Sequence, residues 1–173
     1  MGDEMKVWTT VGSAGTLNAA DLAKVSLKNA VIALGHEIAP PAASEPEDPR
    51  AVIPLATATV RYNVTPVDGL FAVTSNFRYT LQLTYRGKVR ARLVQVDHWT
   101  GVETDLLHFD SASFPPAPSL VMNSTATTND SSVMDFVNSA YYVEATLTAS
   151  AIAVGNPAEI AVVKIYASPD FHG

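Results

Sequence analysis

The sequence of 173 residues contains no cysteine, and only 16% of its residues are charged. Disulfide bonds and thiolate metal sites are therefore excluded, so an apolar core has to hold the fold together. Lysine and arginine number 11 against 17 aspartates and glutamates, which gives a net charge of −6. Binding to a phosphate backbone needs clustered cations, so nucleic acid is not an expected partner.

Long hydrophobic runs are also missing. No stretch approaches the ~18 apolar residues that a membrane-spanning helix needs, so we expect no membrane span. The first residues, MGDEMKVWTT, lack a basic region followed by an apolar one. This pattern does not match a signal peptide, and a cytoplasmic location is therefore favoured.

Motifs that carry chemistry are absent as well. The sequence has no His-Glu-x-x-His zinc motif, no calcium-loop pattern and no Gly-x-Ser-x-Gly elbow. The glycine-rich VGSAG at 11–15 lacks the lysine and the helix of a phosphate loop, so it predicts a turn. We expect no enzyme, no metal and no cofactor. The least implausible catalytic set is Asp97, His98 and Asp105.

The residues that are present follow a period of two. Apolar and polar residues alternate in FRYTLQLTYRG (77–87), ATATVRYNV (56–64) and YYVEATLTA (141–149), which is typical of half-buried antiparallel strands. AEIAVVKIYAS (158–168) is apolar on both faces and predicts a central strand, with Ile160, Val162 and Tyr166 on one face and Val163 and Ile165 on the other. Further strands are predicted at KVWTTVG (6–12) and AKVSLKNAVIALG (23–35), the second with a bulge at Asn29–Ala30.

These patterns predict an all-β protein. Short strands between frequent turn signals favour an antiparallel β-sandwich of jelly-roll or immunoglobulin-like Greek-key kind, with about eight or nine strands. At most one or two short helical turns are expected, at LNAADLA (17–23) and SSVMDFVNSAYY (131–142). The chain is predicted to be a single domain over 1–173. Its proline-rich 37–50 is expected to be a surface loop or crossover, and 122–132 a polar loop.

The segment VDHWTGVETDLLHFD (96–110) is the stretch that most resembles a chemical site, because it holds two histidines and four carboxylates. Gly101 supplies the positive φ of a hairpin turn. A loop over 99–101 would pair His98 with Val102 and Val96 with Thr104, and would leave His98 and His108 far apart. A two-residue loop would change the pairings and would still not bring the two histidines together. Two ligands so distant cannot complete one metal sphere. The segment therefore predicts a hairpin with polar outer residues.

Aromatic residues are the remaining candidates for a binding or interface site. These candidates are Trp99, Tyr141, Tyr142 and Trp8. Trp99 falls at the predicted hairpin tip, where it is poorly placed to join its own core. Low charge and strands apolar on both faces favour a non-enzymatic structural protein that self-assembles into a homo-oligomer. The alternative is a module that binds carbohydrate or another small ligand through exposed aromatic side chains.

Overall fold

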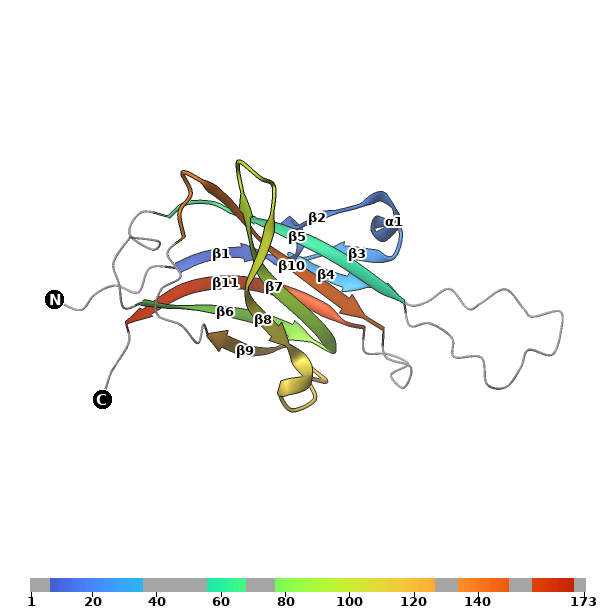
Figure 1. Ribbon diagram of the computed structural model, residues 1–173. Helices are drawn as coiled ribbons and strands as arrows, with labels where there is room; N and C mark the ends of the chain where they lie inside the picture. The colour runs from blue at the N-terminus through green and yellow to red at the C-terminus, as the bar shows by residue number, and fades with distance from the viewer. Residues whose placement is uncertain (1–6, 36–55, 68–76, 127–133, 150–156, 170–173) are drawn as a thin grey trace, which may run out of the picture.

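Two antiparallel β-sheets face each other in the computed structural model, which describes residues 7–35, 56–67, 77–126, 134–149 and 157–169 (Figure 1). Sheet A has the order β3-β4-β11-β6-β9, with β1 also paired to β11. Its strands are β1 (Val7–Val11), β3 (Val25–Lys28), β4 (Val31–Leu34), β6 (Phe77–Arg86), β9 (Val121–Ala126) and β11 (Glu159–Pro169). The predicted all-β sandwich is confirmed, with eleven strands among the described residues in place of eight or nine.

Sheet B has the order β2-β5-β10-β7-β8. Its strands are β2 (Thr16–Leu17), β5 (Thr57–Val64), β7 (Lys88–Asp97), β8 (Glu103–Asp110) and β10 (Ser139–Thr148). Three short helical segments accompany the strands: η1 (Gly12–Ala14), α1 (Ala19–Leu22) and η2 (Ser111–Ser113). The turn predicted at VGSAG and the helical turn predicted at LNAADLA are thereby confirmed as η1 and α1. The segment 136–138 is a turn and not a helix.

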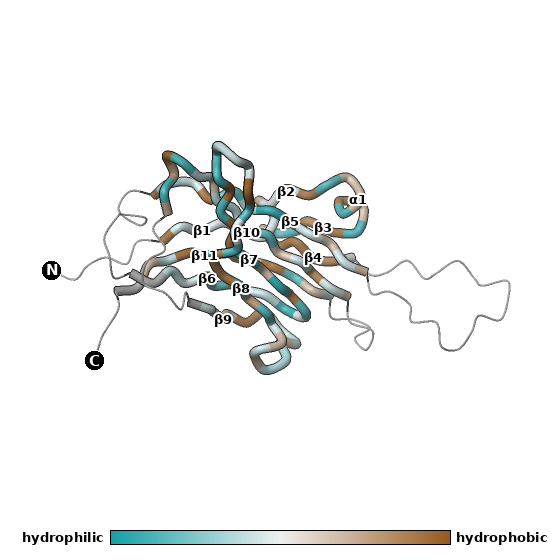
Figure 2. Tube along the Cα trace, viewed as in Figure 1, coloured by the Kyte–Doolittle hydropathy of each residue, from teal (hydrophilic) through white to brown (hydrophobic). Residues whose placement is uncertain are grey.

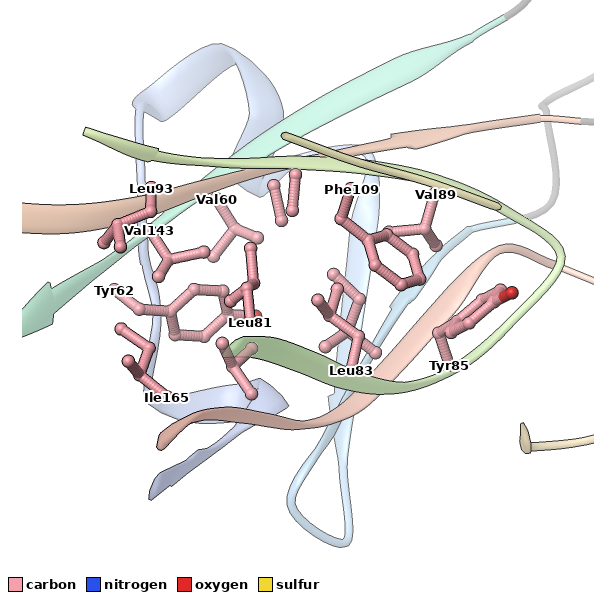
Figure 3. Close-up of a cluster of buried hydrophobic side chains, with 14 of the residues drawn as sticks. Val60, Tyr62, Leu81, Leu83, Tyr85, Val89, Leu93, Phe109, Val143 and Ile165 are labelled. Carbon is pink, nitrogen blue, oxygen red and sulfur yellow. The ribbon is translucent and has the colours of Figure 1, made fainter. Parts of the chain in front are cut away.

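The core lies between the two sheets, because alternation along each strand directs every second side chain inward. Hydropathy accordingly alternates along much of β7 (Figure 2). On β5 the buried positions are Ala58, Val60, Tyr62 and Val64, as the sequence predicted. Figure 3 shows Tyr62 and Val143 from sheet B facing Leu81 and Ile165 from sheet A.

β11 is a central strand, as predicted, since β6 pairs with it along one edge and β1 and β4 along the other. The predicted division of its faces is wrong only at Ile160, which is buried on the same face as Val163 and Ile165 and does not share a face with Val162 and Tyr166. Its register against β6 shifts between Ile160 and Val162, so the inward positions change parity. Ile160, Val163 and Ile165 are the fully buried residues, and Val162 is only half-buried.

Two other predictions are corrected by the strand pairing. Asn29 and Ala30 are the two-residue turn of a β3–β4 hairpin, with φ of 51° and 66°, and not a bulge in one long strand. The predicted polar loop 122–132 begins as strand β9, because residues 121–126 pair with β6; Asn123 also donates from Nδ2 to the Tyr85 hydroxyl at 3.0 Å. Residues 127–133 and the predicted loop 37–50 lie outside the described residues.

Between β1 and β2 the chain crosses from sheet A to sheet B through a space that admits only glycine. A Cβ at Gly12 would lie 1.8 Å from the carbonyl oxygen of Ile160, and one at Gly15 would lie 2.1 Å from a methyl carbon of Val60. The buried hydroxyl of Tyr62 donates to the Gly12 carbonyl at 2.9 Å. This crossover closes one side of the sandwich.

Helix α1 follows the crossover and is fastened to β5 by the buried carboxylate of Asp21. Asn18 caps the helix, and its amide also donates to Asp21 at 2.9 Å. Asp21 accepts from the backbone N–H of Thr59 at 3.1 Å and from Lys24 at 2.8 Å. The hydrogen bond from Lys24, helped by those from Thr59 and Asn18, holds the pKa of Asp21 below its ordinary value.

Gly12→Ala should lower the free energy of unfolding by about 3 kcal/mol, because the methyl group overlaps a backbone carbonyl that cannot move without disturbing β11. Urea denaturation measures this loss. Gly101→Ala is the matched control, since a Cβ at Gly101 would meet nothing within 4 Å and only the φ of 69° would be strained; its loss should stay near about 1 kcal/mol. Equal losses in the two variants would contradict the crossover argument.

Asp21→Asn should destabilise the protein at neutral pH by roughly 1–3 kcal/mol, since a charged acceptor of three groups is lost. The pKa of Asp21 is lower in the folded than in the unfolded protein, so its contribution is complete above the ordinary value of 3.8 and is lost as pH falls through the folded pKa. Denaturant titrations between pH 7 and pH 2 should therefore show the wild-type and variant curves converging at the acid end. A difference independent of pH would refute this account.

Candidate functional site

The outer face of sheet B carries polar side chains in register across four strands. Cross-strand pairing sets Arg61 beside Glu144, Glu144 beside Arg92, and Arg92 beside His108. The flanking rows, given in the order β5, β10, β7 and β8, are Thr59, Thr146, Arg90 and Asp110 on one side and Asn63, Tyr142, Val94 and Asp105 on the other. Side chains in such rows are direct neighbours.

Four of these residues form a continuous ion-pair network, here called the charged ladder: Arg61, Glu144, Arg92 and Asp105. Arg61 Nε donates to Glu144 Oε2 at 2.7 Å, and Arg92 Nε and Nη2 both reach Oε1 at 2.9 Å. Arg92 Nη1 donates to Asp105 Oδ1 at 2.9 Å. Each arginine is therefore neutralised by a carboxylate of the same face.

Glu144 is the centre of the charged ladder. Partial burial raises the pKa of its carboxyl group, but hydrogen bonds from Arg61 and Arg92 outweigh burial and leave this pKa below its ordinary value. Glu144 is consequently ionised at neutral pH. It acts as a shared acceptor that hydrogen-bonds both guanidinium groups on this face.

Two hollows flank Glu144 on this face. The first, of ≈ 350 Å³, lies over β7, β8 and β10, and Arg90, His108 and Thr146 are among its lining residues. The second, of ≈ 550 Å³, lies between β5 and the β2–α1 segment, and is lined in part by Asn18 and Thr59. Because Glu144 lines both hollows, they meet at the charged ladder.

Tyr142 lies beside the charged ladder and is almost wholly buried, at 7% exposure. The guanidinium carbon of Arg61 sits 4.8 Å from the centre of its ring, which is a cation–π contact. Its hydroxyl is buried, and none of the described residues meets hydrogen-bond geometry with it. Burial, and next the neighbouring Glu103 carboxylate, raise the pKa of Tyr142. Of the predicted aromatic candidates, Tyr142 is the one on this face, and Arg61 covers its ring.

Two of the predicted ligand or interface residues, Trp8 and Tyr141, lie inside the core and not at the surface. Trp8 is 6% exposed and Tyr141 is 3% exposed, and both belong to the core between the sheets. Alternation explains the difference from Tyr142, because adjacent residues of β10 point to opposite faces. Neither side chain is available to a ligand.

Trp99 is 86% exposed at the tip of the β7–β8 hairpin. The predicted hairpin is confirmed, but its register near the tip is wrong by one residue: Val96 pairs with Glu103 and not with Thr104. A bulge between Leu93 and Val94 restores the predicted register nearer the base. Gly101 has the expected positive φ of 69°.

The structure does not assemble the catalytic set considered from the sequence. Asp97 accepts hydrogen bonds from its own turn, from Trp99 and Thr100, whereas Asp105 binds Arg92 in the charged ladder. Within the described ranges, no three His, Asp or Glu side chains gather closely enough to hold a metal ion. Neither α1 nor another helix of the described residues could span a membrane.

Sequence reasoning missed Glu144, Arg61 and Arg92 as a site. Each occupies a polar position of a correctly predicted alternating strand, so the outward direction was available from the sequence. The order β5-β10-β7 was not, because these strands come from distant parts of the chain.

Comparison with known proteins identifies no family: no family model and no curated protein matches the sequence. Among solved structures, "Mannan Binding Module from Man5C in bound conformation" is similar with a TM-score of 0.35 and 13% identity. The likeness covers 94% of this chain and 97% of that chain. At this level it carries no argument about function, which has to rest on the sheet B face itself.

Glu144→Gln should lower the free energy of unfolding by roughly 1–3 kcal/mol, since it removes the charge shared by two arginines. Thermal or urea denaturation provides the measurement. Glu103→Gln is the control, because Glu103 is 3.8 Å from Arg92 and its side chain is 43% exposed; its effect should stay below about 0.5 kcal/mol. Similar effects of both substitutions would show that Glu144 is not the centre of the network.

Proposed function

We propose that this protein is a non-enzymatic carbohydrate-binding module that takes a neutral saccharide across the outer face of sheet B. The observation that carries the proposal is the charged ladder, internally neutralised and flanked by two hollows that meet at Glu144. A row of fixed donors and acceptors is suited to a ligand rich in hydroxyl groups.

The charges of the ladder neutralise one another, and this favours an uncharged ligand. An anionic ligand would have to compete with Glu144 for Arg61 and Arg92, and a cationic ligand would have to compete with the arginines for Glu144 and Asp105. A hydroxyl group can instead donate to remaining carboxylate lone pairs and accept from guanidinium N–H groups without breaking an ion pair. Threonines 59 and 146, which line the hollows, add further hydroxyls.

The ionisation of Glu144 favours binding over hydrolysis. A glycosidase needs one carboxylic acid that stays protonated near neutral pH, through a raised pKa. The pKa of Glu144 is shifted in the opposite direction, because two arginines bind its carboxylate. Glu144 is therefore suited to accept hydrogen bonds from a sugar and not to protonate a glycosidic oxygen.

Self-assembly into a homo-oligomer, which the sequence also suggested, stays a prediction. Its direct measurement is the mass of the purified protein in solution over a series of concentrations. A polysaccharide-binding function does not depend on the result.

The proposal predicts retention by at least one neutral polysaccharide in affinity electrophoresis against galactomannan, xylan, mixed-linkage β-glucan and cellulose. Thr146→Tyr, which fills the first hollow, should weaken binding at least about tenfold, the equivalent of 1.4 kcal/mol. Thr148→Tyr is the matched control, because Thr148 is the next outward residue of β10 and lines neither of the two hollows. It should bind within about twofold of wild type.

Failure of the wild-type protein to bind all four polymers would refute the proposed function. Equal loss in both threonine variants would also count against it, since the effect would then follow from the added ring and not from the hollow.

A further inference from the structure

The turn that carries Trp99 is fixed by one side chain. Asp97 Oδ1 accepts from the backbone N–H of Trp99 at 2.9 Å and of Thr100 at 2.7 Å, and also from the Thr100 hydroxyl at 2.9 Å. Gly101 donates its N–H to the Asp97 carbonyl at 2.9 Å. The Trp99 side chain, which is 86% exposed, is therefore carried by a turn whose backbone is held by several hydrogen bonds.

A second turn, before β10, has the same construction. Asp135 Oδ1 accepts from the backbone N–H of Val137 at 2.9 Å and of Asn138 at 3.3 Å. In both turns the residue two positions after the aspartate is apolar and exposed, since Val137 is 83% exposed. We call the two turns, 97–101 and 135–138, the twin-turn tip.

The two turns are joined to each other and to the core. His98 donates its backbone N–H to the Asn138 carbonyl at 2.9 Å, which continues the β7–β10 ladder past its last pair. The Asp135 N–H donates to the buried Tyr141 hydroxyl at 2.8 Å, and the Phe136 ring packs 4.8 Å from that of Tyr141. Little backbone conformational entropy remains for a ligand to remove at this tip, which favours binding.

The charge at the tip limits what can bind there. Hydrogen bonds from Thr100 to Asp97, and from Asn138 to Asp135, lower the pKa of each carboxyl group, so both are ionised at neutral pH. Two negative charges beside Trp99 repel phosphates, and therefore disfavour nucleic acid and anionic membranes.

The size of the twin-turn tip further limits which partners can bind there. An aromatic side chain offers about 150–250 Å² of surface, whereas a stable protein interface needs roughly 800 Å² on each partner. Trp99 and Val137 together are too small for such an interface. One indole face matches a single ligand ring that has an apolar face and hydroxyl groups at its edge, which is the chemistry of a neutral pyranose.

We propose that Trp99 is a second contact for the polysaccharide that binds sheet B, with its indole stacked on one pyranose ring. This inference rests on the proposed function and adds a dependence on ligand length. Arg92 and Trp99 are seven residues apart on an extended strand and its turn, so the two contacts are separated by roughly 20 Å. A polymer reaches both contacts, but a short fragment reaches one.

Two-point attachment predicts an avidity gain, since joining two weak contacts commonly raises affinity by about 10²–10⁴. Trp99→Ala should therefore weaken binding to the polymer at least about tenfold and leave the affinity for its trisaccharide fragment unchanged. Thr146→Tyr should weaken binding of both ligands. Trp99→Phe, which keeps an aromatic ring, should recover part of the polymer affinity.

The test uses the polymer retained most strongly in the four-polymer panel, and its trisaccharide, with the full chain by isothermal calorimetry. Thermal denaturation confirms that each variant is folded, as expected for the exposed position 99. Tryptophan fluorescence provides a second measurement, because the sequence has two tryptophans and Trp8 is buried. Polymer should shift the emission of Trp99 to shorter wavelength, and the trisaccharide should not.

Equal polymer affinity of Trp99→Ala and wild type, with loss in Thr146→Tyr, would overturn the second contact and leave the proposed function intact. Failure of wild type to bind any polymer would overturn both. A multimeric wild type that becomes monomeric in Trp99→Ala, or a wild type whose Trp99 emission shifts with neutral phosphatidylcholine vesicles, would assign the tip to another partner and overturn the inference.

Discussion

Packing of the two inward sheet faces against each other is the constraint on which this structure depends. Without cysteine, stability has to come from burial of apolar surface, and both sheets supply it through the alternation of inward and outward side chains along most of their strands. The Tyr62 hydroxyl binds the crossover at Gly12, where the main chain passes so close to β11 that a single methyl group would overlap it. The contact of Tyr62 with Gly12 therefore helps to fix both the packing of the two sheets and the path of the chain between them.

The candidate site follows from the other half of the same alternation. Once Tyr141 and Val143 point into the core, Tyr142 and Glu144 have to point out, and the register brings Arg61 and Arg92 to either side of Glu144. Both arginines are used within the sheet, which leaves a face dense in hydrogen-bonding groups but without unbalanced charge. The surface on which we propose saccharide binding is therefore a product of the same alternation and pairing that build the core.

Prediction from the sequence failed where the backbone departs from regular pairing. The bulge in β11 changed its buried positions, and the bulge between Leu93 and Val94 shifted the register at the hairpin tip. Asn29 and Ala30 formed a hairpin turn where a bulge was expected, because both residues adopt positive φ. A one-residue change of register moves every later side chain to the other face, so these small irregularities have large consequences.

The sequence by itself determined the all-β class, strands β5 and β10, the β7–β8 hairpin and the exposure of Trp99, because these depend on local alternation and turn residues. Tertiary structure alone decided which strands are neighbours. Only then did Glu144 meet two arginines, Trp8 and Tyr141 become core residues, and the turns at Asp97 and Asp135 come together. Long-range pairing is a property of the whole packed chain, since local patterns direct a side chain in or out but do not choose its neighbour.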